Sequence, residues 1–158
     1  MGGNIRHHRH GNPREVLAAA VADVAALGTV ATVSRIIESE PLGPSRRRYA
    51  NGALLLESTL EPESLLDALQ QIERDYGTRR GRRWTARVLD LDIVLWSGGR
   101  FASRRLTIPH PAFRTRRFVL DPARTIAPGW RDPVTGRTLM QLAATLRKVR
   151  QRAGKAGP

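Results

Sequence analysis

Apolar residues recur three or four positions apart in three stretches of the chain, which is the spacing of a helix with one buried face. These stretches are 13–27, 62–76 and 139–146. The residues of an N-cap, a first-turn proline and a capping box open the first stretch at Asn12, Pro13 and Glu15, and Gly28 follows it as a natural end. The pattern therefore predicts three amphipathic helices.

Three other stretches are typical of β-strands, because apolar and β-branched residues dominate them or alternate with polar ones. They are 29–37, 49–57 and 89–96. In the last one, Leu89, Leu91 and Ile93 alternate with two carboxylates, Asp90 and Asp92. Successive side chains of a strand point to opposite faces, so we expect both aspartates on one face and the apolar residues on the other.

The order helix, strand, strand, helix, strand places the chain in the α+β class. One further strand in front would complete a ferredoxin-like fold, an αβα sandwich with a mainly antiparallel sheet. The sequence starts directly before a turn-like Gly2-Gly3-Asn4, so we expect this first strand to be missing from the chain. A truncated or misassigned start is the explanation that we favour.

The length suits one domain with a real core, which we place at residues 1–146, followed by a basic tail at 147–158 that we expect to be disordered. Lys and Arg number 27 against 14 Asp and Glu, and the net charge of +13 favours anionic partners such as nucleotide phosphates or nucleic acid. The absence of cysteine excludes disulfide and thiolate chemistry. No apolar stretch reaches membrane-spanning length and no signal peptide is visible, so we expect a cytoplasmic protein.

The richest chemistry lies between residues 79 and 92. Five arginines and Trp84 run directly into the pair Asp90-x-Asp92. Two carboxylates on one strand face are a site for hard divalent cations, and neighbouring guanidinium groups favour a polyphosphate that bridges metal and arginine. The alternative is an edge strand whose two aspartates are only solvated beside a basic loop.

Several motifs accompany this pair in a fixed order. They are Ser39-x-Pro41-x-Gly43, Tyr49-x-Asn51, Gln70-x-x-Glu73, Trp84-x-x-Arg87-x-x-Asp90-x-Asp92, Pro109-His110-Pro111 and Arg116-x-Phe118-Val119-Leu120. The set resembles the 6-hydroxymethyl-7,8-dihydropterin pyrophosphokinases of folate biosynthesis. The resemblance implies transfer of diphosphate from ATP to the pterin hydroxymethyl group, with release of AMP. We expect a monomer that acts on these two small molecules and binds neither nucleic acid nor a membrane.

The resemblance also implies roles for individual residues. Asp90 and Asp92 are expected to hold two magnesium ions, and Arg80, Arg82 and Arg87 to serve catalysis by clamping phosphates. The residues expected to bind ATP are Gln70, Glu73, Trp84, Arg87, Ile93, Thr107, His110 and Arg116. The residues expected to bind the pterin are Ser39, Leu42, Tyr49, Asn51 and Phe118, with the two aromatic rings on either side of the flat ligand.

Two other functions stay open at this point. A non-catalytic homologue could bind pterin or nucleotide without turnover, which the missing strand favours and the complete set of expected site residues disfavours. A nucleic-acid-binding module could use a basic ferredoxin-like sheet. The paired carboxylates disfavour that reading, because they would repel nucleic acid unless metal is present.

Overall fold

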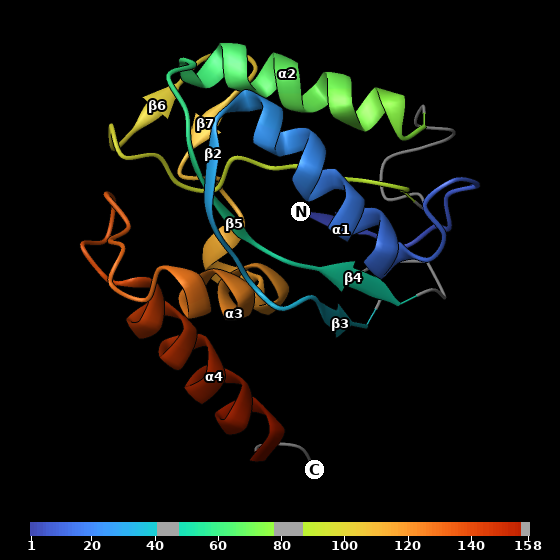
Figure 1. The fold of residues 1–158 in the computed structure, drawn as a ribbon. Helices are drawn as coiled ribbons and strands as arrows, with labels where there is room; N and C mark the ends of the chain where they lie inside the picture. Colours follow the sequence, from blue (N-terminus) through green and yellow to red (C-terminus); the bar gives the residue numbers. More distant parts are fainter. Residues whose placement is uncertain (41–47, 78–86, 156–158) are drawn as a thin grey trace.

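The computed structural model describes residues 1–40, 48–77 and 87–155. Over these ranges the protein is an αβα sandwich (Figure 1). Helices α1 (Pro13–Val24) and α2 (Pro62–Asp75) cover one side of the strands, while α3 (Arg117–Ile126) lies on the other side with α4 (Leu139–Lys155) packed against it. This arrangement confirms the α+β class that the order of elements predicts.

The strands pair in short antiparallel groups. A three-stranded sheet has the order β1 (Gly2–Gly3), β4 (Tyr49–Asn51), β3 (Ile37–Ser39), and two-stranded pairs join β2 (Thr29–Val33) to β5 (Leu54–Glu57) and β6 (Phe101–Ala102) to β7 (Thr107–Ile108). Single 3-10 turns, η1 (Ala25–Leu27) and η2 (Phe113–Thr115), precede β2 and α3. All of these strand pairs are antiparallel, as expected.

The strands predicted at 29–37 and 49–57 are each broken in two. Ser34 lies at the break, where its backbone N donates to the Ala53 carbonyl (2.8 Å) and its Oγ accepts from the Ala53 N (2.9 Å). The hydroxyl takes the place of one ladder bond, so the four short strands form one bent hairpin. A serine whose side chain competes for backbone groups explains the break.

The N-terminal glycines, which we expected in a turn, form β1 in the middle of the sheet. Gly2 exchanges two backbone hydrogen bonds of 2.8 Å with Asp90 on one side and faces Asn51 of β4 on the other. A Cβ on Gly3 would lie 2.2 Å from the Val88 carbonyl oxygen, so this close approach of two backbones requires glycine.

The strand predicted at 89–96 is reduced to a single bridge, between Asp90 and Gly2. Two-residue β1 offers it only one pair, and the next amide, that of Leu91, donates to the Glu73 carboxylate instead (2.6 Å). The alternation of faces is nevertheless right. Leu89 and Leu91 are buried, whereas Asp90 is half-buried and Asp92 is exposed.

The helices at the first two predicted positions begin where the sequence indicates. Asn12 accepts from the backbone N of Arg14 and Glu15, and the Glu15 carboxylate accepts from the Asn12 N, which completes the predicted capping box. Helix α4 runs to Lys155, past the predicted end at Leu146. Helix α3 was not predicted, because Pro122 lies inside it.

Two separate apolar clusters form the core. One joins α1 and α2 to β4 and the segment around Leu91, and the other joins α3, α4 and η2 around Phe113. Within the described ranges, no helix is long and apolar enough to cross a membrane. The two clusters leave a cleft between them, and its walls carry the polar residues described next.

Candidate active site

A cleft of about 1210 Å³ opens between α2, the β4–β5 hairpin, the segment from Arg87 to Ser97 and the start of α3. Most of the expected site residues line it. They are Ser39, Tyr49, Asn51, Gln70, Glu73, Arg87, Asp90, Asp92, Ile93, His110, Arg116 and Phe118. Residues far apart in the sequence thus meet around one space large enough for two small molecules.

Five expected residues do not contribute to this cleft as described. Thr107 lies in a second, smaller hollow of about 410 Å³, between the β6–β7 hairpin and Arg114. Leu42, Arg80, Arg82 and Trp84 lie outside the described residues. The expected catalytic set is therefore placed here only for Arg87, Asp90 and Asp92.

Negative charge is concentrated where the Asp90 segment faces α2. Burial and the neighbouring Asp92 charge raise the pKa of Asp90 above its usual range, against the opposing effect of Arg87. Burial is also the main cause that raises the pKa of Glu73, despite the hydrogen bond that its carboxylate accepts from the Leu91 N. The protein does not neutralise this group of carboxylates by itself, so the site favours an added cation.

Arg87 is held in place from the N-terminal strand. The Asn4 side chain accepts from the Arg87 N (2.8 Å), and the Asn4 N donates to the Arg87 carbonyl (2.9 Å). The Arg87 guanidinium forms an ion pair with Asp90, three residues further on. A cation is therefore fixed beside the carboxylates, where it could also bind a phosphate.

The metal-binding capacity of the cleft is limited. No group of three or more His, Cys, Asp or Glu in the described parts of the chain is placed to hold a metal ion. Two carboxylates without further protein ligands fit magnesium, which keeps several waters and takes phosphate oxygens as additional ligands. Sites for zinc need three or four protein ligands, which this part of the molecule does not provide.

The other end of the cleft is suited to a flat polar ring. Asn51 is buried, and its amide NH2 donates to Ser39 Oγ (2.9 Å) and to the Tyr49 carbonyl (3.3 Å). Phe118 lines the same space, with the Arg116 guanidinium 5.9 Å from the centre of its ring. Ser39 thus fixes the orientation of the Asn51 amide, a contact that the spacing of the motif does not predict.

His110 projects into the cleft from the segment after β7. Its Nδ1 accepts from the Ala112 N (3.2 Å), and its own backbone N donates to the Val94 carbonyl (3.0 Å). The Nδ1 contact places the ring proton on Nε2 when the ring is neutral, so Nε2 is the donor available to a ligand.

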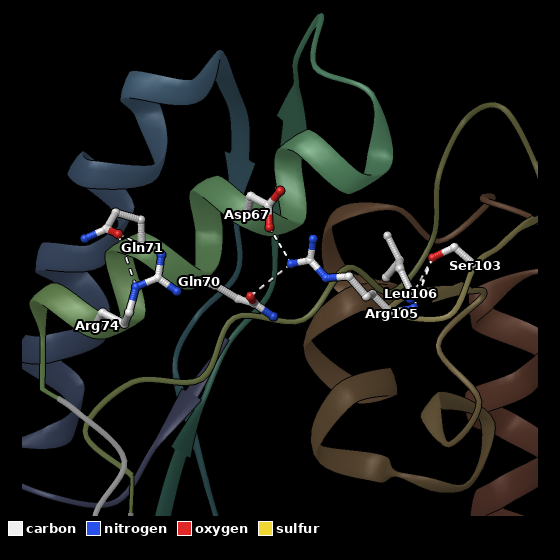
Figure 2. A network of polar contacts seen from close by, with 7 residues as sticks. All are labelled: Asp67, Gln70, Gln71, Arg74, Ser103, Arg105 and Leu106. Carbon is white, nitrogen blue, oxygen red and sulfur yellow. Dashed lines mark hydrogen bonds and ion pairs between the residues drawn. The ribbon is translucent and has the colours of Figure 1, made fainter.

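Sequence reasoning missed Arg105, which also lines the cleft. Figure 2 shows its guanidinium reaching from the β6–β7 turn to α2, where it contacts Asp67 and Gln70. Nothing in the sequence distinguishes Arg105 from the neighbouring Arg104. Only the fold, which brings the turn against α2, identifies it.

Comparison with known proteins agrees with this geometry. A family model described as 7,8-dihydro-6-hydroxymethylpterin-pyrophosphokinase (HPPK) matches residues 1–128. The chain belongs to the HPPK family. The resemblance drawn from the sequence motifs is thereby confirmed.

Bacterial relatives show the extent of the similarity to other HPPK proteins. All three described here are named 2-amino-4-hydroxy-6-hydroxymethyldihydropteridine pyrophosphokinase. The protein of Synechocystis sp. is 38% identical over 144 residues, which cover 90% of this chain and 71% of the relative. That of Pseudomonas aeruginosa is 42% identical and covers 84% and 83%, and that of Haemophilus influenzae is 42% identical and covers 73% and 74%.

Proposed function

We propose that this HPPK protein transfers diphosphate from ATP to 6-hydroxymethyl-7,8-dihydropterin in folate biosynthesis, with magnesium as cofactor. Family membership supports a pyrophosphokinase that acts on this pterin. One observation carries the proposal furthest: a single cleft combines an under-neutralised carboxylate pair, Asp90 and Asp92, with an aromatic and amide end at Tyr49, Asn51 and Phe118. The two ends match the two substrates.

In the proposed reaction the pterin hydroxymethyl oxygen bonds to the β-phosphorus of ATP. The bond from that phosphorus to the oxygen bridging to the α-phosphate breaks, so AMP leaves with its electron pair, and the hydroxyl proton passes to water. Positioning and electrostatic stabilisation supply most of the rate in such transfers, so no protein nucleophile is needed.

The residues of the cleft have separate tasks in this scheme. Asp90 and Asp92 would hold magnesium, of which we expect two ions. When bound, magnesium would neutralise the phosphate charge and polarise the transferring group. Arg87 and Arg116 would bind phosphate oxygens, and His110 would donate a hydrogen bond from Nε2.

At the pterin end, the flat ring would lie between Tyr49 and Phe118. Asn51, whose orientation Ser39 fixes, would bind the polar edge of the ring. Gln70 and Glu73 would face the nucleotide from α2. Arg80 and Arg82, in the segment outside the described residues, remain proposed phosphate clamps on the basis of the motif alone.

The test is AMP release from ATP, measured with and without hydroxymethyl-dihydropterin and magnesium. The proposal predicts release only when both are present. Binding of ATP or pterin without any AMP release would instead favour a non-catalytic homologue. Tighter binding of random oligonucleotides than of ATP, lost at high salt, would favour the nucleic-acid module.

A further inference from the structure

Three side chains meet at the outer end of the cleft, on α2 and on the turn between β6 and β7. Arg105 Nη2 donates to the Asp67 carboxylate and to Gln70 Oε1, the latter at 3.4 Å. The backbone N atoms of Arg105 and Leu106 both donate to Ser103 Oγ at 3.2 Å, which holds the turn. Figure 2 shows the guanidinium between the two α2 side chains, so the contact connects the turn with the helix.

Helix α2 indicates which part of a bound nucleotide this group would meet. Asp67, Gln70 and Glu73 follow one another at intervals of three residues, each about 4.5 Å further along the axis. Glu73 lies beside the Asp90 segment, because its carboxylate accepts from the Leu91 N. If ATP phosphates lie at Asp90 and Asp92, as the proposed function requires, then Gln70 and Arg105 are at the level of the nucleoside.

The chemistry of Arg105 sets the orientation of the Gln70 amide. A guanidinium group has only donors, so the amide must turn its oxygen toward Arg105. The Gln70 NH2 group is then the one left for a ligand. Asp67 in turn holds the guanidinium, whose side chain is 49% exposed and would otherwise be free to leave the helix.

A fixed amide is selective, whereas a free amide is not. An NH2 donor pairs with an acceptor such as N1 of adenine, but meets another donor at the N1–H of guanine. An amide that can rotate presents its oxygen instead and accepts either base. We therefore infer that Asp67 is a positioning residue for nucleotide selectivity, which through Arg105 holds Gln70 as a donor and favours ATP over GTP.

The same helix provides a matched control. Arg74 donates to Gln71 Oε1 through Nε (3.1 Å) and Nη2 (2.7 Å), and the Gln71 NH2 donates to Asp75 (2.8 Å). This second set has the same residue types but does not line the cleft. Asp75→Asn removes a carboxylate from α2 without touching the group at Asp67.

The experiment measures kcat and KM for ATP and for GTP, with hydroxymethyl-dihydropterin and magnesium, in the unaltered protein and in Asp67→Asn, Asp67→Glu and Asp75→Asn. We expect Asp67→Asn to raise the KM for ATP, to leave kcat nearly unchanged, and to reduce the ATP-to-GTP ratio of kcat/KM about fivefold, the factor of one ordinary hydrogen bond. Asp67→Glu should restore much of the ratio. Asp75→Asn should leave it unchanged.

Three results would overturn the inference: an unaltered protein that does not prefer ATP, an Asp67→Asn variant with the original ratio, or an equal change in Asp75→Asn. Calorimetric binding of ATP and GTP to the same variants, without pterin, gives the ratio independently of turnover. A protein that binds ATP selectively through Asp67 but releases no AMP would therefore contradict the proposed function alone.

Discussion

Two regions of the molecule contain a buried or half-buried aspartate, and they treat it in opposite ways. Asp132, in the turn before α4, is fully buried and accepts from Arg114 Nε (2.7 Å) and Nη2 (2.6 Å), Thr135 Oγ1 (2.5 Å) and the Val134 N (3.1 Å). These bonds hold its pKa far below the usual range, with the Arg114 contact as the largest cause. Asp90, in the cleft, has a raised pKa, because burial and Asp92 outweigh Arg87.

The difference shows what each region is built for. Around Asp132 the protein supplies every partner that the carboxylate needs, so the charge stabilises the local fold. Around Asp90 it supplies one guanidinium against several carboxylates, and the remaining compensation must come from outside. Incomplete neutralisation by the protein is therefore the feature that separates the candidate active site from a structural ion pair.

Asp132→Ala should have the largest effect, on stability. The substitution leaves the partly buried Arg114 without its carboxylate, and breaking a buried pair in this way costs about 3–5 kcal/mol. Chemical denaturation should show this loss, while the protein that remains folded keeps its turnover. Asp121→Ala, which removes a partner of Arg117 and Arg124 on the surface of α3, should cost at most about 1 kcal/mol. Equal costs for the two variants would remove the contrast.

Asp90→Ala and Asp92→Ala should have the opposite profile. Each should lower turnover more than a hundredfold, equivalent to about 2.7–4 kcal/mol of lost transition-state stabilisation. Neither should reduce the free energy of unfolding much, because removal of one carboxylate relieves repulsion on the other. AMP-release kinetics and denaturation of the same samples test both parts. Asp75→Asn serves as the control, and near-normal turnover in either cleft variant would refute the metal assignment.

The two regions should also respond differently to pH. Asp132 has a lowered pKa in the folded state, so its contribution is complete above the unfolded value of 3.8 and is lost as the pH falls further. Asp90 and Glu73 have raised pKa values, so the folded state holds protons that the unfolded chain has released, and their contribution declines as the pH rises.

Magnesium affinity gives the clearest reading of this smaller effect. The ion needs ionised ligands, so affinity should fall on acidification at pH values where ordinary carboxylates are still charged. Calorimetric titration with magnesium across mildly acidic pH would measure it. Affinity that stays constant down to the usual carboxylate range would show that Asp90 is not a ligand, or that its pKa is not raised.

The sequence predicts best where the determinants are local. The capping box at Asn12 and Glu15 fixes the start of α1 through contacts three residues apart, and the alternation around Asp90 separates buried from polar side chains. It fails where a distant partner decides the structure. Ser34 breaks a strand because Ala53 lies opposite, and Leu91 leaves the ladder because Glu73 accepts its amide proton.

The site divides in the same manner. Motif spacing brings most expected residues to one cleft, since each motif occupies the end of an element that the fold directs there. Spacing does not predict the second layer of contacts, such as Ser39 on Asn51 or Arg105 on Gln70, because these depend on the relative placement of β3, β4, α2 and the β6–β7 turn. Thr107, which matches the motif set, faces a different hollow.

The most direct test of the central claim is the magnesium-dependent change in melting temperature in the presence of ATP, for the unaltered protein and for Asp92→Asn. With chelator, the variant should melt at the same temperature as the unaltered protein or higher, because one carboxylate charge is gone. With magnesium, the unaltered protein should gain stability by ligand binding and the variant should gain little. A variant that melts markedly lower with chelator and still shows the full magnesium-dependent rise would contradict the claim that these carboxylates serve a cation.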